Sequence, residues 1–114
     1  MPRFAANLGH LFTEYPLLER FGAAAACGFT AVELQFPYDV VPAAVKAELE
    51  RHGLTQLGVN TPQGPEFGLA ALPGRERDFA AAFKRALDAQ IGDFTWTMPL
   101  PTDLTPAKPA AASR

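Results

Sequence analysis

The sequence predicts an α/β fold built from about three successive strand-helix units. Three short apolar stretches, at 3–8, 31–36 and 55–60, each have the length and composition of a β-strand. Each is followed by a segment whose apolar residues recur at helical spacing, and glycine or proline separates the segments. Strands that alternate with helices pair in parallel through right-handed crossovers, so we expect one parallel sheet.

The first unit combines a strand at 3–8 (RFAANL) with the helix that follows it. Pro16, preceded by Thr13, is typical of a helix start, because proline already has the backbone angle of the first turn. Gly28 ends the helical pattern. The residues that recur at helical spacing are Leu17, Leu18, Phe21 and Ala25.

The second unit has a strand at 31–36 (AVELQF), a loop at 36–39 (FPYD) and a helix that Pro42 opens and Gly53 closes. Val45 and Leu49 lie one helical turn apart and are expected to face the core. The charged residues on the same helix, expected in water, are Lys46, Glu48, Glu50 and Arg51.

The third unit has a strand at 55–60 (TQLGVN), a loop at 61–74 and a helix at about 75–90. Phe79, Phe83 and Leu87 share one face of that helix. We therefore expect one domain at 1–90.

The segment 91–114 is predicted to be a disordered tail, distinct from the units before it. Its four prolines from position 99 onward oppose a regular helix and a central strand. Phe94 and Trp96 are expected to dock on the sheet as ordinary apolar anchors.

Successive side chains of a strand point to opposite faces, so each predicted strand has an apolar side and a polar side. The apolar set, expected to pack beneath the three helices, comprises Phe4, Leu8, Val32, Leu34, Phe36, Leu57 and Val59. The other side carries Ala5, Asn7, Glu33, Gln35, Gly58 and Asn60. Asn7, Glu33 and Asn60 are candidates for a polar cavity; on a one-sided sheet the same residues would simply face water or satisfy neighbouring backbone.

The composition favours a soluble protein that acts on small molecules. A net charge of -2 and a pI near 5.6 give no basic surface for nucleic acid or for an anionic membrane. Cys27 is the single cysteine, which excludes an internal disulfide, and its alanine-rich surroundings predict a buried thiol. There is no apolar stretch of membrane-spanning length and no signal-peptide pattern, so a cytoplasmic location is expected.

Three strings identify a family resemblance. MPRFAANLGHLFTEYPLLERF at the start, VELQFPYD at 32–39 and ALPGRE at 71–76 resemble the N-terminal third of the hydroxypyruvate isomerase family. That family belongs to the sugar isomerase and epimerase group of (β/α)8 barrels. The resemblance thus implies a partial TIM barrel, because a complete one needs roughly 250 residues and this sequence has 114.

The resemblance implies an aldose-ketose type isomerase of glyoxylate and carbohydrate metabolism, which converts hydroxypyruvate into tartronate semialdehyde through an enediolate. In such enzymes two glutamates transfer the proton and help to hold a divalent metal, commonly magnesium. Those residues come from later strands, so no catalytic or metal residue carries over and no cofactor is expected for this chain. Alone, it is expected to be a truncated or frame-disrupted member without activity. The residues of this chain that are expected to contact a small hydroxy-keto acid substrate are Asn7, Glu33, Tyr38 and Asn60.

Two departures from the family pattern and two alternatives remain. Relatives commonly carry Ser-Met where this chain has Gly9-His10, and the loop at 61–74 is shorter here. His10 is expected to be a loop histidine without a catalytic role.

The substrate of close relatives with similar N-termini is 2-oxo-tetronate, which the sequence does not separate from hydroxypyruvate. The chain could instead be a non-catalytic module that binds a small ligand or self-associates through open strand edges.

Overall fold

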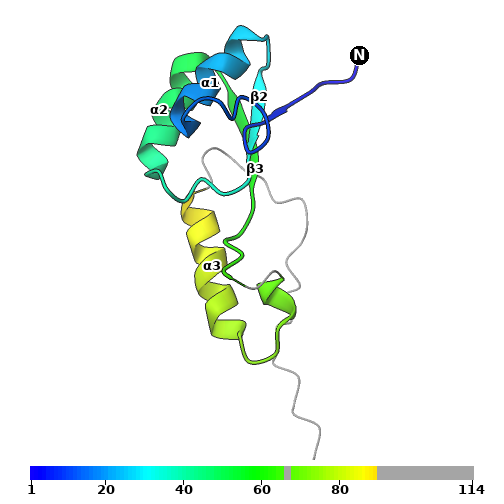
Figure 1. The fold of residues 1–114 in the computed structure, drawn as a ribbon, viewed down its shortest axis with the longest axis vertical. Coiled ribbons are helices and arrows are strands. Elements are labelled where there is room, and N and C mark those ends of the chain that lie inside the picture. Colours follow the sequence, from blue (N-terminus) through cyan, green and yellow to red (C-terminus); the bar gives the residue numbers. More distant parts are fainter. Residues whose placement is uncertain (66–67, 90–114) are drawn as a thin grey trace, which may run out of the picture.

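The computed structural model describes residues 1–65 and 68–89 and confirms the α/β fold with three parallel strands (Figure 1). The sheet has the order β1-β2-β3, with bounds Ala6–Asn7, Ala31–Leu34 and Thr55–Val59. The helices are α1 (Leu17–Ala26), α2 (Pro42–His52), the short 3-10 helix η1 (Leu69–Ala71) and α3 (Glu76–Ala89). The predicted tail at 91–114, with Phe94 and Trp96, lies outside the described residues.

The strands are shorter than predicted, and two aromatic residues are exposed as a result. Ala6 pairs with Val32, so Phe4 lies opposite Thr30, before β2 begins, and its side chain is 72% exposed. Phe36 follows Leu34, the last residue of β2, and is 42% exposed. The prediction that both phenylalanines face the helices was wrong, because neither lies within the paired part of the sheet.

An irregularity in β3 overturns the predicted position of Leu57. Val32 pairs with Gln56, but the next matched pair is Leu34 with Val59, so β3 has one extra residue between the two pairs. Such a bulge reverses the alternation of side chains along the strand. Gln56 is consequently buried on the helix side, whereas Leu57 is 44% exposed.

The core lies between the sheet and two helices, α1 and α2, which pack side by side on one face (Figure 1). Phe21 of α1 is the largest fully buried side chain, and Val45 and Leu49 of α2 are buried as predicted. The central cluster comprises Ala6, Leu8, Phe21, Ala24, Val32, Leu34, Val45, Leu49 and Leu54. Alternate residues of β2 therefore meet one face of each helix, which is what the sequence pattern predicted for the first two units.

The end of α2 shows why a glycine is needed there. Gly53 adopts a left-handed conformation with φ of 63°, which glycine reaches without steric cost. The turn lets the Leu54 amide donate to the Leu49 carbonyl at 2.9 Å. Leu54 itself enters the core, so the cap also starts the approach to β3.

Helix α3 does not cover the sheet, contrary to the prediction that three helices would. Figure 1 shows it beyond the end of β3, with its last turn close to the start of α2. It packs against η1, and its Phe79 and Phe83 rings stack with centroids 6.1 Å apart. The long connection from β3 carries α3 away from the sheet, so its aromatic residues take no part in the central cluster.

Two smaller findings concern the surface. Cys27, predicted to be buried, is exposed, because it follows the last residue of α1 instead of facing the core. Among the described residues, none of the helices is both long and apolar enough to cross a membrane.

Replacing Phe21 with alanine should lower the free energy of unfolding by about 3–5 kcal/mol, because a fully buried ring leaves a cavity. Urea denaturation followed by circular dichroism measures the change. Phe4→Ala is the matched control: its ring is 72% exposed, and it should cost much less. Equal losses in both variants would contradict the position found for Phe4.

We propose that the chain self-associates through its outer strands. Within the described part of the chain, β1 and β3 each pair on one side only, and free strand edges tend to pair with other chains. Sedimentation velocity should show an average mass that rises with protein concentration. A monomer at every concentration would refute the proposal.

Candidate functional site

The carboxyl ends of the three parallel strands meet at one edge of the sheet, where α/β proteins usually bind ligands. Asn7 ends β1 and pairs with Glu33. Gln35 lies two residues beyond Glu33, and its carbonyl accepts the Asn60 amide at 2.9 Å. These pairings place four polar residues in the same phase at the same edge, as the sequence predicted.

The first group at this edge, the amide-imidazole cluster, consists of Asn7, Gly9, His10 and Gln35. The Asn7 Oδ1 accepts the Gly9 amide at 2.9 Å, and the Gln35 Nε2 lies 3.0 Å from the His10 Nε2. A Cβ atom on Gly9 would lie 2.8 Å from the Gln35 Oε1 and 3.1 Å from the Asn7 Oδ1. Glycine at this position thus leaves room for the end of the Gln35 side chain, which would have to shift if position 9 carried a side chain.

The turn after β1 is fixed by backbone bonds and by one arginine. The amides of His10 and Leu11 both donate to the Asn7 carbonyl, at 3.1 and 2.9 Å. Arg20 of α1 donates from Nη1 to the Leu8 carbonyl at 2.7 Å and from Nε to the Tyr15 carbonyl at 2.8 Å. The backbone that carries His10 is therefore tied to both β1 and α1.

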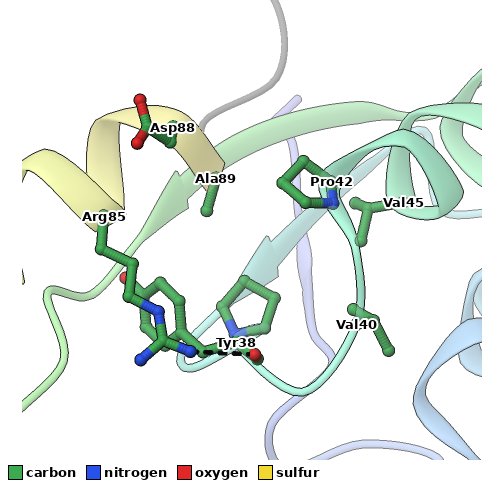
Figure 2. Close-up of a pocket in the computed structure, with 8 residues that line it drawn as sticks. Tyr38, Val40, Pro42, Val45, Arg85, Asp88 and Ala89 are labelled. Atoms are coloured by element: carbon green, nitrogen blue, oxygen red, sulfur yellow. Dashed lines mark hydrogen bonds between the residues drawn. The ribbon is translucent and has the colours of Figure 1, made fainter.

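The second group, the tyrosine bracket, joins the loop after β2 to β3 and α3. The Tyr38 hydroxyl donates to the Asn60 carbonyl, and the Arg85 Nη2 donates to the Tyr38 carbonyl at 3.1 Å. The Arg85 guanidinium also lies 4.8 Å from the centre of the Tyr38 ring, within the range of a cation-π contact. Figure 2 shows Arg85 reaching from α3 across the loop to Tyr38.

The environment of Tyr38 favours the neutral phenol. Partial burial raises the pKa of Tyr38 above its usual value of 10.0, and the positive charge of Arg85 opposes this in part. The hydroxyl therefore keeps its proton, and with it the hydrogen bond to Asn60, at neutral pH.

Three hollows adjoin these groups. One of about 460 Å³ lies beyond Asn60, where β3 leads into the segment before η1, and is bordered by Phe79. Another of about 270 Å³ lies beside Gly9 and Gln35. The third, of about 130 Å³, lies between the loop after β2 and α3 and is the one drawn in Figure 2. The lining of the third comprises Pro37, Tyr38, Val40, Pro42, Val45, Arg85, Asp88 and Ala89.

The structure places three of the four predicted site residues in these two groups and leaves Glu33 outside both. Asn7 belongs to the amide-imidazole cluster, whereas Tyr38 and Asn60 come together in the tyrosine bracket. Glu33 lies on the same face as Asn7, with its side chain exposed. Binding of substrate by these four residues stays a prediction.

The sequence predicted neither Gln35 nor Arg85 as a site residue, and it predicted no partner for His10. Gln35 could have been found, because it shares the phase of Glu33 and lies nearer the end of its strand. The bond between His10 and Gln35 joins residues 25 positions apart, and Arg85 lies 47 positions from Tyr38. No spacing pattern signals pairs so distant in sequence.

The site holds no complete metal-ligand set in the described segments 1–65 and 68–89. No three histidine, cysteine, aspartate or glutamate side chains in those segments lie close enough to hold an ion. Glu33 is the one carboxylate among the predicted site residues. The residues present therefore suit hydrogen bonding to oxygen atoms of a ligand.

Comparison with known proteins matches residues 21–90 to the model of the xylose isomerase-like TIM barrel family. The 2-oxo-tetronate isomerase of Cupriavidus necator is 52% identical over 92 residues, which cover 77% of this chain and 35% of that protein. The hydroxypyruvate isomerase of Escherichia coli is 45% identical over 94 residues, covering 75% and 36%.

A solved structure shows the same arrangement of strands and helices. The crystal structure of an AP endonuclease, family 2, from Brucella melitensis superposes with a TM-score of 0.75 at 47% identity. The match covers 78% of this chain and 36% of that one. This chain thus spans about a third of the length of the proteins it matches.

Replacing Tyr38 with phenylalanine should lower the free energy of unfolding at pH 7 by about 1 kcal/mol, through loss of the bond to Asn60. Because folding raises the pKa of Tyr38, its contribution is complete below the unfolded pKa and disappears as pH rises through the folded pKa. Urea denaturation at pH 7 and in steps above pH 10 measures both effects.

The matched control is Tyr15→Phe, which removes the other tyrosine hydroxyl of the chain. The difference between the wild type and Tyr38→Phe should shrink with rising pH. A difference that grows would contradict the environment described for Tyr38.

Proposed function

The chain belongs to the xylose isomerase-like TIM barrel family, and on that basis we propose that it forms the substrate-side wall of an isomerase for short hydroxy-oxo acids. The observation that carries the proposal is the convergence of Asn7, Gln35 and Asn60 at the carboxyl edge of three parallel strands. In (β/α)8 barrels this edge lines the mouth where substrates bind.

The side chains at this edge suit the orientation of a substrate. Amide and imidazole groups donate hydrogen bonds to the hydroxyl, ketone and carboxylate oxygens of such an acid. Glu33 is the one carboxylate among the predicted site residues, whereas moving a proton between adjacent carbons requires an acid and a base suitably placed. We therefore assign binding and positioning to this segment.

We propose that the proton-transfer residues and the divalent metal of the family lie on later strands of the barrel. Two features support this division of roles. The chain spans about a third of its relatives, and the described residues do not fit a metal site. On this proposal the segment alone catalyses no isomerisation.

Between the two substrates of the relatives, 2-oxo-tetronate is favoured. Relatives named for it are 52%, 50% and 45% identical, compared with 45% for the hydroxypyruvate isomerase of Escherichia coli. Both compounds are 2-oxo acids with a hydroxyl on the neighbouring carbon, so the same polar side chains can bind either compound. Hydroxypyruvate remains the second candidate.

A chimera tests the proposal. Residues 1–89 would replace the matching segment at the start of the Cupriavidus necator relative, whose remaining two-thirds would complete the barrel. The chimera should isomerise 2-oxo-tetronate, with a higher kcat/KM than for hydroxypyruvate. The chain alone and the remaining two-thirds alone serve as controls, and neither should turn over either compound. A chimera that folds, as judged by circular dichroism, and converts neither compound would refute the proposed function.

A further inference from the structure

We propose that His10 and Gln35 form a subsite for the carboxylate end of the substrate, in which His10 donates a ring N–H and Gln35 holds the ring in place. This inference rests on the proposed function, because it states which end of the hydroxy-oxo acid meets which side chains. It makes His10 a residue that sets specificity and Gln35 a positioning residue.

The contact between the two side chains determines which ring nitrogen can donate. The Gln35 Nε2 lies 3.0 Å from the His10 Nε2. An amide nitrogen only donates, so in the neutral ring Nε2 accepts and Nδ1 carries the hydrogen. His10 is exposed at the carboxyl edge of the sheet, and on this proposal its Nδ1–H donates to the ligand.

The same pair also accommodates the protonated ring. With a hydrogen on Nε2, the Gln35 amide would turn so that Oε1 accepts from the ring and Nε2 moves toward Gly9. The Asn7 Oδ1 lies on that side as well, since both amide oxygens would crowd a Cβ on Gly9, at 2.8 and 3.1 Å. In both charge states Nδ1–H donates, and the protonated ring adds a positive charge.

The charges around the pair do not by themselves select an anion. Arg20 and Asp39 both border the hollow of about 270 Å³ beside Gly9 and Gln35, and they oppose each other in sign. Arg20 already donates to two backbone carbonyls. Glu33 lies two residues before Gln35 with its side chain exposed. A preference for a carboxylate at this edge therefore depends on a directed donor, and His10 supplies one.

Gly9 leaves room for the Gln35 side chain in the position where it meets His10. Any side chain at position 9 would meet the Gln35 Oε1 at a distance that requires the glutamine to move. Gly9→Ala should therefore displace Gln35 from His10 while both functional side chains remain in the chain. The Gly9→Ala variant therefore tests the position of the His10 ring without removing the ring.

Nuclear magnetic resonance on the full chain with 15N-labelled histidines tests the inference. Hydroxypyruvate is the probe, and dihydroxyacetone, which has a hydroxymethyl group in place of the carboxylate, is the uncharged control. Hydroxypyruvate should shift the ring nitrogens of His10, with the hydrogen on Nδ1, and dihydroxyacetone should shift them far less. His52, the other histidine, lies at the end of α2 and should not respond.

Variants separate contact from positioning. His10→Met should weaken hydroxypyruvate binding about tenfold, the effect of losing one charge-assisted hydrogen bond. His10→Gln keeps an N–H donor and should restore part of the affinity. Gly9→Ala should weaken binding similarly and also change the 15N signature of His10, which a merely structural role would not explain. His52→Met is the matched control and should bind as the wild type does.

The outcomes distinguish this inference from the proposed function. If the His10 ring ignores hydroxypyruvate, or if His10→Met binds it as tightly as the wild type, the subsite is refuted even when the chimera is active. Equal responses to hydroxypyruvate and dihydroxyacetone refute it as well. An inactive chimera refutes the proposed function by a measurement that does not depend on His10.

Discussion

The parallel pairing of β2 with both of its neighbours is the constraint on which the rest of the structure depends. Parallel strands require a crossover between them, and in both cases the crossover contains a helix, α1 or α2, on the same face of the sheet. The same direction brings the three carboxyl ends to one edge. Core and candidate site are thus two results of one pairing pattern, with Val32 and Leu34 facing the helices and Glu33 facing away.

The sequence predicted the order of the elements and most of the core because these depend on local periodicity. Phe21, Val45 and Leu49 are buried as their helical spacing indicated, and Pro42 and Gly53 mark the two ends of α2. The errors arise where the outcome depends on a partner strand. Leu57 was assigned to the wrong face because the extra residue in β3 is visible only in its pairing with β2.

The candidate site was predictable in position but not in connectivity. Strand phase placed Asn7, Glu33 and Asn60 at one edge, and the structure agrees. Which side chains meet depends on loops that converge from distant parts of the sequence. The contacts of Tyr38 with Asn60 and Arg85, and of His10 with Gln35, all cross between elements and carry no local signature.

The tyrosine bracket contributes to the position of α3, which would otherwise depend on the connection between β3 and α3. Arg85 contacts both the ring and the carbonyl of Tyr38, so the loop after β2 holds the last turns of α3, in addition to η1, against which α3 packs. The position of the helix then depends less on the segment between β3 and η1. A change in length between β3 and η1 should therefore leave the contacts of Arg85 with Tyr38 in place, so this segment can differ in length without moving the last turns of α3.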